Sequence, residues 1–270
     1  MSRSHEREVT GVRGPIAVRE WFRGAPRFVA LLSHGYGEHA ARYDRVAAAL
    51  VRHGAAVYAP DHQGHGRSGG ERVLITDFED IVTDLRSVAA EATAEHPSVP
   101  LVMIGHSMGG MIAARYAQRY GADLTALVLS GPLIGRSAGV EVLLSMEEIP
   151  DIPIDPATLS RDPEVGSAYA ADPLVWHGPF KAPTLRAFAA MQAAINKTGR
   201  IDVPTLWLHG AEDQLVPIGD TQVGIDAIRG SDFTEKIYPG ARHEVFNETH
   251  RDEVIADVLA FLDRVLDSAV

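Results

Sequence analysis

A five-residue motif, Gly105-His106-Ser107-Met108-Gly109, constrains the fold of this chain most strongly. It follows an uncharged apolar run over 101–104, which is typical of a buried strand, and an alanine-rich helical pattern begins directly after it. In a G-x-S-x-G arrangement the serine occupies a sharp, strained turn between strand and helix, and the glycines keep neighbouring side chains away from it. The motif therefore predicts that the Ser107 hydroxyl is exposed at the end of a sheet strand, where it can act as a nucleophile.

Other apolar runs recur along the chain and alternate with stretches of helical spacing. The runs predicted as strands cover 28–32, 55–59, 101–104, 126–129 and 205–208, and an edge strand is expected over 16–22. Because the main runs are apolar throughout, they suit strands of a parallel sheet that are buried on both faces. Apolar residues spaced three and four apart predict helices over 78–89 and 254–265. We therefore expect an α/β fold with a mostly parallel central sheet flanked by helices.

The alternation stops between residues 132 and 200, where prolines separate short helical pieces. The many large apolar residues of this region, including most of 140–146, argue against disorder. A long insertion between two strands of a compact domain is commonly functional. We therefore expect residues 132–200 to form an inserted helical cap over the site, and residues 1–131 and 201–270 to form the core.

Composition excludes several classes of protein. The chain has 25 Lys+Arg against 36 Asp+Glu, a net charge of -11, and no basic cluster, so we expect no nucleic-acid partner. Cysteine is absent, which excludes disulfides, thiolate catalysis and cysteine–metal sites. No apolar run approaches the ~20 residues of a membrane-spanning helix, and the first ten residues lack the apolar core of a secretory signal. We expect a cytoplasmic protein without a metal or other cofactor.

The catalytic partners of Ser107 should follow it in the sequence, because such sites have the order serine, acid, histidine. His243 lies on a loop after the last strand-like run, 233–238, and a Pro-Gly turn. Loops at the carboxyl ends of parallel strands are where ligands meet such a sheet, so His243 is predicted as the base that takes the serine proton. The acid that orients this base is Glu212 or Asp213. Periodicity does not separate these two neighbours, since both follow the preceding strand.

The reaction also requires hydrogen-bond donors for a developing oxyanion. One predicted donor is the backbone N–H of Met108, directly after the nucleophile. The second is the N–H of Tyr36, in the glycine-flanked turn that follows the strand over 28–32. We interpret a further histidine-containing stretch, 61–68, as a glycine-rich turn and not as a metal site, because no additional ligand cluster accompanies it.

Taken together, these segments resemble the monoacylglycerol lipase and lysophospholipase branch of the α/β-hydrolases. The resemblance lies in residues 34–43, 61–68, 105–110, 209–217 and 238–244, and in 154–161 and 169–174 of the insertion. It therefore extends over nearly the whole chain. The H-G-x-G-E-H-x-x-R-Y pattern over 34–43 is more specific than the serine motif alone. One departure is Phe246, at a position where some relatives have a second histidine.

The resemblance implies an α/β-hydrolase fold whose insertion is a mobile, lipid-facing cap. It implies hydrolysis of one ester bond in a monoacylglycerol, through an acyl-enzyme intermediate, to a free fatty acid and glycerol. Lysophospholipids or other carboxylic esters are the alternative substrates for the same residues. The apolar stretch of the cap is expected to contact a membrane or micelle surface reversibly.

The resemblance also implies roles for particular residues. It selects Asp213 as the acid and places the oxyanion donors at Tyr36 and Met108. It further implies a polar pocket for the glycerol head group near Glu38, Arg42 and Tyr169.

Overall fold

The computed structural model describes residues 4–268, and within them eight strands form one sheet in the order β1-β2-β4-β3-β5-β6-β7-β8. The strands are β1 (Ser4–Gly11), β2 (Gly14–Trp21), β3 (Phe28–Ser33), β4 (Ala55–Pro60), β5 (Leu101–His106), β6 (Ala126–Ser130), β7 (Thr205–Gly210) and β8 (Phe233–Tyr238). β1 and β2 pair antiparallel with their neighbours, and all other pairs are parallel. The predicted α/β class and the main predicted strands are confirmed.

The prediction of an edge strand over 16–22 is wrong in one respect. That segment forms β2, which lies between β1 and β4, and the edge of the sheet is β1. The sequence pattern did not predict β1, because Val9 is its only buried residue and the strand has almost no apolar periodicity. Contacts with β2 hold β1 in place: Val9 pairs with Ile16 in the strand ladder, and Arg7 forms an ion pair with Glu20.

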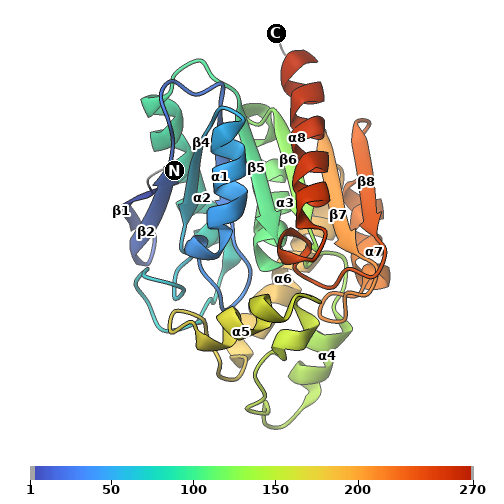
Figure 1. Cartoon of the computed structure of the whole chain (residues 1–270). Helices are drawn as coiled ribbons and strands as arrows, with labels where there is room; N and C mark the ends of the chain where they lie inside the picture. The colour runs from blue at the N-terminus through green and yellow to red at the C-terminus, as the bar shows by residue number, and fades with distance from the viewer. Residues whose placement is uncertain (1–3, 269–270) are drawn as a thin grey trace.

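Helices cover both faces of the sheet (Figure 1). α1 (Asp44–Arg52) and α8 (Arg251–Ser268) pack on one face, and α2 (Phe78–Glu95), α3 (Met108–Tyr120) and α7 (Ile218–Ile228) on the other. Along β3, Val29 and Leu31 belong to the core layer beneath α2 and α3, whereas Ala30 and Leu32 belong to the layer beneath α1 and α8. Successive side chains of a strand point to opposite faces, and this explains why the central strands are apolar throughout.

The region over 132–200 contains α4 (Ala138–Ser145), α5 (Pro163–Ala171) and α6 (Ala182–Thr198). These helices lie at the carboxyl end of the parallel strands, in the lower part of Figure 1. Short 3-10 turns complete the described structure at Ala40–Tyr43, Gly121–Asp123, Pro156–Thr158 and Val245–Asn247. Among residues 4–268, no helix is both long enough and apolar enough to cross a membrane.

Candidate active site

Ser107 occupies the sharp turn between β5 and α3 that the sequence predicts. Its backbone has φ 55° and ψ −120°, a left-handed conformation that is uncommon for a residue with a side chain. Side chains at the flanking glycines would collide with the backbone: a Cβ on Gly105 would meet the carbonyl of Gly109, and one on Gly109 would meet the carbonyl of Ser33. The G-x-S-x-G spacing therefore reflects how closely α3 approaches β3 and β5 at this turn.

His243 and Asp213 come together at the carboxyl ends of β8 and β7. His243 Nδ1 lies 2.7 Å from Asp213 Oδ2, and both side chains are buried. The other carboxylate oxygen, Oδ1, accepts hydrogen bonds from the backbone N–H groups of Leu215 at 3.0 Å and Val216 at 2.9 Å. The carboxylate is thus held on both of its oxygens, and it fixes the orientation of the His243 ring.

The pKa values of this pair shift in opposite directions. Burial lowers the pKa of His243, but the adjacent Asp213 carboxylate outweighs burial and leaves that pKa above its ordinary value. Burial raises the pKa of Asp213, and the attraction to His243 outweighs it, so the carboxyl pKa is lowered. An ionised Asp213 accepts the proton of His243 Nδ1, which leaves Nε2 free to accept a proton from a nucleophile.

A second histidine, His209, supports the turn that holds Asp213. The Trp207 indole N–H donates to His209 Nδ1 at 3.2 Å, so the ring proton of His209 resides on Nε2. Nε2 donates to the Val216 carbonyl at 2.9 Å and lies 3.4 Å from Asp213 Oδ2. Burial lowers the pKa of His209 and keeps the ring neutral near pH 7. Sequence reasoning gave this residue no role.

The loop after β3 carries the predicted oxyanion donor Tyr36 in a fixed peptide. His34 Nδ1 donates to the Gly35 carbonyl at 2.8 Å, and His34 Nε2 accepts the backbone N–H of His62 at 2.9 Å. The bond from His62 therefore fixes the His34 tautomer, and it explains the position of the histidine-containing turn over 61–68. Because C=O and N–H of a trans peptide point in opposite directions, the Tyr36 N–H points away from His34.

This loop passes directly beside the serine. A Cβ on Gly35 would lie 3.2 Å from the Ser107 Cβ, so a side chain at that position would crowd the hydroxyl. Neither Tyr36 nor Met108 donates its backbone N–H to another residue in the described part of the chain. Both residues line the same pocket as Ser107. The geometry is suited to stabilising an anion at the serine, and the two donors remain a prediction.

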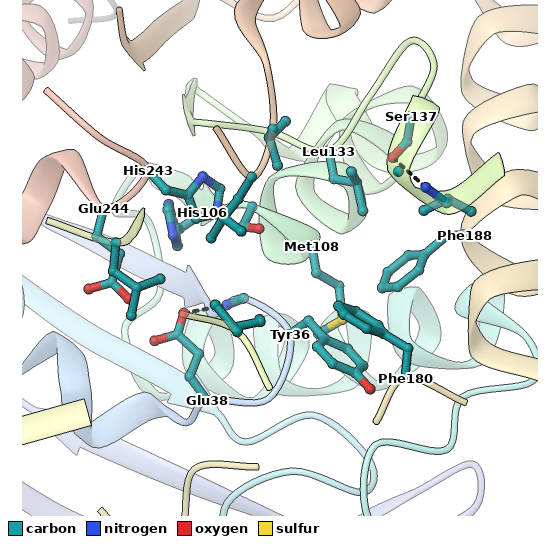
Figure 2. Close-up of a pocket in the computed structure, with 18 of the residues that line it drawn as sticks. Tyr36, Glu38, His106, Met108, Leu133, Ser137, Phe180, Phe188, His243 and Glu244 are labelled. Atoms are coloured by element: carbon teal, nitrogen blue, oxygen red, sulfur yellow. Dashed lines mark hydrogen bonds between the residues drawn. The ribbon is translucent and has the colours of Figure 1, made fainter. Parts of the chain in front are cut away.

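A pocket of about 300 Å³ opens above Ser107 and His243, and its two ends differ in polarity. Figure 2 shows Glu38 and Glu244 at one end and Phe180 and Phe188 at the other. Further apolar side chains line the pocket at Leu133, Val140, Leu143, Ile154, Leu159 and Leu185. Within residues 4–268, no group of three or more histidine or carboxylate side chains is placed to hold a metal ion.

The polar end brings together the three residues predicted near the head group. Arg42 donates to Glu38 at 2.5 Å, and its guanidinium carbon lies 5.0 Å from the centre of the Tyr169 ring. Glu38 also accepts hydrogen bonds from Gly35 N–H at 2.6 Å and from the Tyr43 hydroxyl at 2.7 Å. Glu38 thus connects this end of the pocket to the loop that carries Tyr36.

Sequence reasoning missed one residue of the polar end. Glu244, next to His243, accepts two hydrogen bonds from Arg42, at 2.6 and 2.8 Å, and its side chain is only 5% exposed. A single glutamate on a loop normally indicates a solvated surface position. It belongs to the segment 238–244 that carries the resemblance, but its role was not indicated there, because its partner Arg42 lies 202 residues away in the sequence.

Comparison with known proteins agrees with this geometry. The Hydrolase_4 family model, described as serine aminopeptidase, S33, matches residues 24–250. A monoacylglycerol lipase of Mycolicibacterium smegmatis is 41% identical over 88% of this chain and 88% of its own length. A monoglyceride lipase of Homo sapiens is 32% identical over 83% of this chain and 78% of its own length.

Solved structures place the chain in the same group. The monoacylglycerol lipase of Paleococcus ferrophilus is 28% identical and superimposes with a TM-score of 0.78 over 92% of this chain and 98% of its own. A soluble variant of the Saccharomyces cerevisiae monoglyceride lipase has a TM-score of 0.84 over 98% and 96% of the two chains, and at 22% identity it shows a shared fold. The chain therefore belongs to the serine aminopeptidase S33 family of α/β-hydrolases, within its monoacylglycerol lipase branch.

Proposed function

We propose that this chain hydrolyses monoacylglycerols to a free fatty acid and glycerol through an acyl-enzyme intermediate. The observation that carries the proposal is a single pocket, lined by both Ser107 and His243, that has an apolar end and a charged, hydrogen-bonding end. An ester with one acyl chain and one polyhydroxyl head group has the same division of polarity. The relatives named monoacylglycerol lipase support this choice of substrate.

In the proposed mechanism, Ser107 Oγ attacks the ester carbonyl while His243 Nε2 takes its proton. Asp213 holds His243 in the required tautomer and stabilises the imidazolium that forms. The backbone N–H groups of Tyr36 and Met108 bind the oxyanion of the tetrahedral intermediate. His243 then protonates the departing glycerol oxygen, and a water activated by His243 cleaves the acyl-enzyme in the second half of the reaction.

We assign the apolar end to the acyl chain and the polar end to glycerol. Glycerol hydroxyls can donate to the carboxylates of the polar end and contact Glu38, Arg42 and Tyr169 there. Burial raises the pKa of the Tyr169 hydroxyl, so it stays protonated as a donor. A second acyl chain at this end would place apolar surface against buried charges and separate them from their polar partners, which is unfavourable.

We further propose that residues 132–200 act as a cap over a core made of residues 1–131 and 201–270. Val140 and Leu143 of α4 contribute to the pocket wall, which supports the cap assignment. The segment near Leu159 is tied to the loop of the catalytic histidine, since its carbonyl accepts the Glu244 N–H at 2.8 Å and the nearby Arg161 pairs with Glu248 at 3.0 Å. We therefore assign any opening of the cap to α4 and the loop after it.

A panel of glycerides tests the proposed substrate. We expect kcat/KM to be highest for monoacylglycerols and at least tenfold lower for di- and triacylglycerols. Each methylene buried at the apolar end contributes about 0.8 kcal/mol at most, so kcat/KM should rise with acyl chain length until the pocket is full. The measurement uses purified enzyme, matched detergent and several concentrations of each glyceride. Equal or faster turnover of triacylglycerol would contradict the proposal, and faster turnover of lysophospholipid would favour the alternative substrate class.

We also propose that the cap contacts lipid surfaces reversibly. Val142, Met146 and Ile152 are 52%, 43% and 66% exposed, although they are large apolar residues, and they lie close together in the sequence on and after α4. Exposed carboxylates lie among them at Glu147 and Glu148. An uncharged or zwitterionic surface suits this combination better than an anionic one, because carboxylates are repelled by anionic lipids.

Sedimentation with phosphatidylcholine vesicles tests the contact. The double variant Val142→Ser, Ile152→Ser should bind about fivefold to tenfold more weakly than the wild type, because it removes two apolar side chains from the interface. Val223→Ser, at a similarly exposed valine on α7, is the matched control and should bind like the wild type. Equal loss of binding in the control, or stronger binding to anionic vesicles, would contradict the proposed contact.

A further inference from the structure

The polar end of the pocket contains two carboxylates and one cation. Arg42 lies between Glu38 and Glu244, with Nη1 donating to Glu38 at 2.5 Å and to Glu244 at 2.6 Å, and Nη2 donating to Glu244 at 2.8 Å. The three side chains are 11%, 5% and 5% exposed in the order Arg42, Glu38 and Glu244. Arg42 is the only lysine or arginine among the described residues that line the pocket.

Glu38 and Arg42 carry opposite charges near pH 7. Burial raises the pKa of Glu38, but Arg42 and other neighbours, including the Tyr43 hydroxyl that donates to it, together outweigh burial and bring that pKa to about 2. Both oxygens of Glu244 accept from Arg42, and one of them also accepts from the Asn247 amide at 2.8 Å, as an ionised carboxylate does. The adjacent His106 adds no positive charge, because burial lowers its pKa to about 4. The cluster of Glu38, Arg42 and Glu244 therefore has a formal charge of −1.

Such a cluster cannot bind an anionic head group as an arginine normally would. A phosphate at this end would have to displace a carboxylate from Arg42 and would then face the unpaired carboxylate at close range. An uncharged polyol avoids both problems, because its hydroxyls can donate to the carboxylate oxygens. If one extra negative charge lies about 6 Å from an anionic head group, at an effective dielectric constant of about 20, their repulsion weakens binding by a factor on the order of 10–100.

We propose that the cluster of Glu38, Arg42 and Glu244 selects substrates by the sign of the head-group charge, and that Glu244 determines this selection. Esters with uncharged or cationic head groups are accepted, and esters with anionic head groups are rejected. Without Glu244 the cluster would be neutral, and Arg42 would have two donors free for an anion. The inference rests on the proposed function, since it assumes that the ester head group occupies the polar end.

Three esters with the same lauroyl chain test the selection in the wild-type enzyme. These are 1-lauroylglycerol (uncharged), lauroylcholine (cationic) and 1-lauroylglycerol 3-phosphate (anionic), each measured below its critical micelle concentration. We expect kcat/KM for the phosphate ester to be at least tenfold lower than for either of the others. Hydrolysis of the phosphate ester at the rate of 1-lauroylglycerol would overturn the inference. Equal rejection of both charged esters would also overturn it, because burial of any charge would then decide the selection.

The variant Glu244→Gln tests the role of that carboxylate. It should raise the ratio of kcat/KM for the phosphate ester to kcat/KM for 1-lauroylglycerol by about tenfold. The ratio cancels any general effect on His243, its neighbour in the sequence. Glu164→Gln removes an exposed carboxylate on α5, outside the pocket, and should leave the ratio unchanged. An unchanged ratio in Glu244→Gln, or an equal rise in Glu164→Gln, would overturn the inference.

A fourth ester separates failure of this inference from failure of the proposed function. If 4-nitrophenyl laurate is hydrolysed but 1-lauroylglycerol is not, the proposed substrate is wrong. The comparison of lauroylcholine with the phosphate ester then still decides whether the sign of the charge matters. A different outcome is that 4-nitrophenyl laurate, 1-lauroylglycerol and lauroylcholine are all hydrolysed and the phosphate ester is hydrolysed as fast as 1-lauroylglycerol. In that case the proposed function stands and the charge selection does not.

Discussion

Replacing Ser107 by alanine should lower kcat by a factor on the order of 10⁴–10⁶ and leave the fold intact. The substitution removes the oxygen that would form the acyl-enzyme, and neither His243 nor the oxyanion donors can replace it. Alanine has the same Cβ as serine, so the close contacts around the turn remain satisfied. Initial rates of 1-lauroylglycerol hydrolysis measure the loss, and circular dichroism with thermal unfolding verifies the fold.

Ser87→Ala is the matched control for this variant. Ser87 is exposed on α2, far from the pocket, and its substitution should change neither the rate nor the unfolding temperature. A fluorophosphonate probe should label the wild type and the Ser87 variant but not the Ser107 variant. Retention of more than a few per cent of the activity by purified Ser107→Ala would show that another residue is the nucleophile.

The central strands could be predicted from the sequence because a strand that is buried on both faces consists of a continuous run of apolar residues. β5, for example, is buried along its whole length, and the apolar run over 101–104 marks it. β1 has no such run, since it is held mainly by backbone pairing and by ion pairs such as Arg7–Glu20. An edge strand with one buried residue has no periodicity that a sequence pattern can detect.

The residues of the candidate site also fall into two groups, those that local sequence features specify and those that depend on distant partners. Ser107 and His243 were predictable because local features specify them, namely the flanking glycines of one turn and the strand end before the other loop. The choice between Glu212 and Asp213 depended on resemblance. In the structure Glu212 is exposed, whereas Asp213 is buried and bonded to His243. Glu244 could not be predicted, because its role depends on a partner that only the fold brings near.

Replacing Asp213 by asparagine should reduce kcat/KM by about 10⁴. The hydrogen bonds around the carboxylate give the reason. Oδ1 accepts the N–H groups of Leu215 and Val216, so the amide oxygen of asparagine must take that position. Its NH₂ group then faces His243 Nδ1, which must accept a hydrogen bond, and the ring proton moves to Nε2. In that tautomer Nε2 cannot take the serine proton.

The pH dependence of the residual activity provides a second readout of the same substitution. His243 must be neutral to act as a base, so activity falls as the pH drops through its pKa, which Asp213 raises above the ordinary value. Without the carboxylate, burial dominates and the pKa falls, so the acid limb of the kcat/KM profile should move to lower pH. Glu212→Gln is the matched control, because it removes an adjacent exposed carboxylate, and it should change neither rate nor profile. If Glu212→Gln proved the more damaging variant, Glu212 would be the acid, since only loss of the carboxylate that holds His243 can produce both effects.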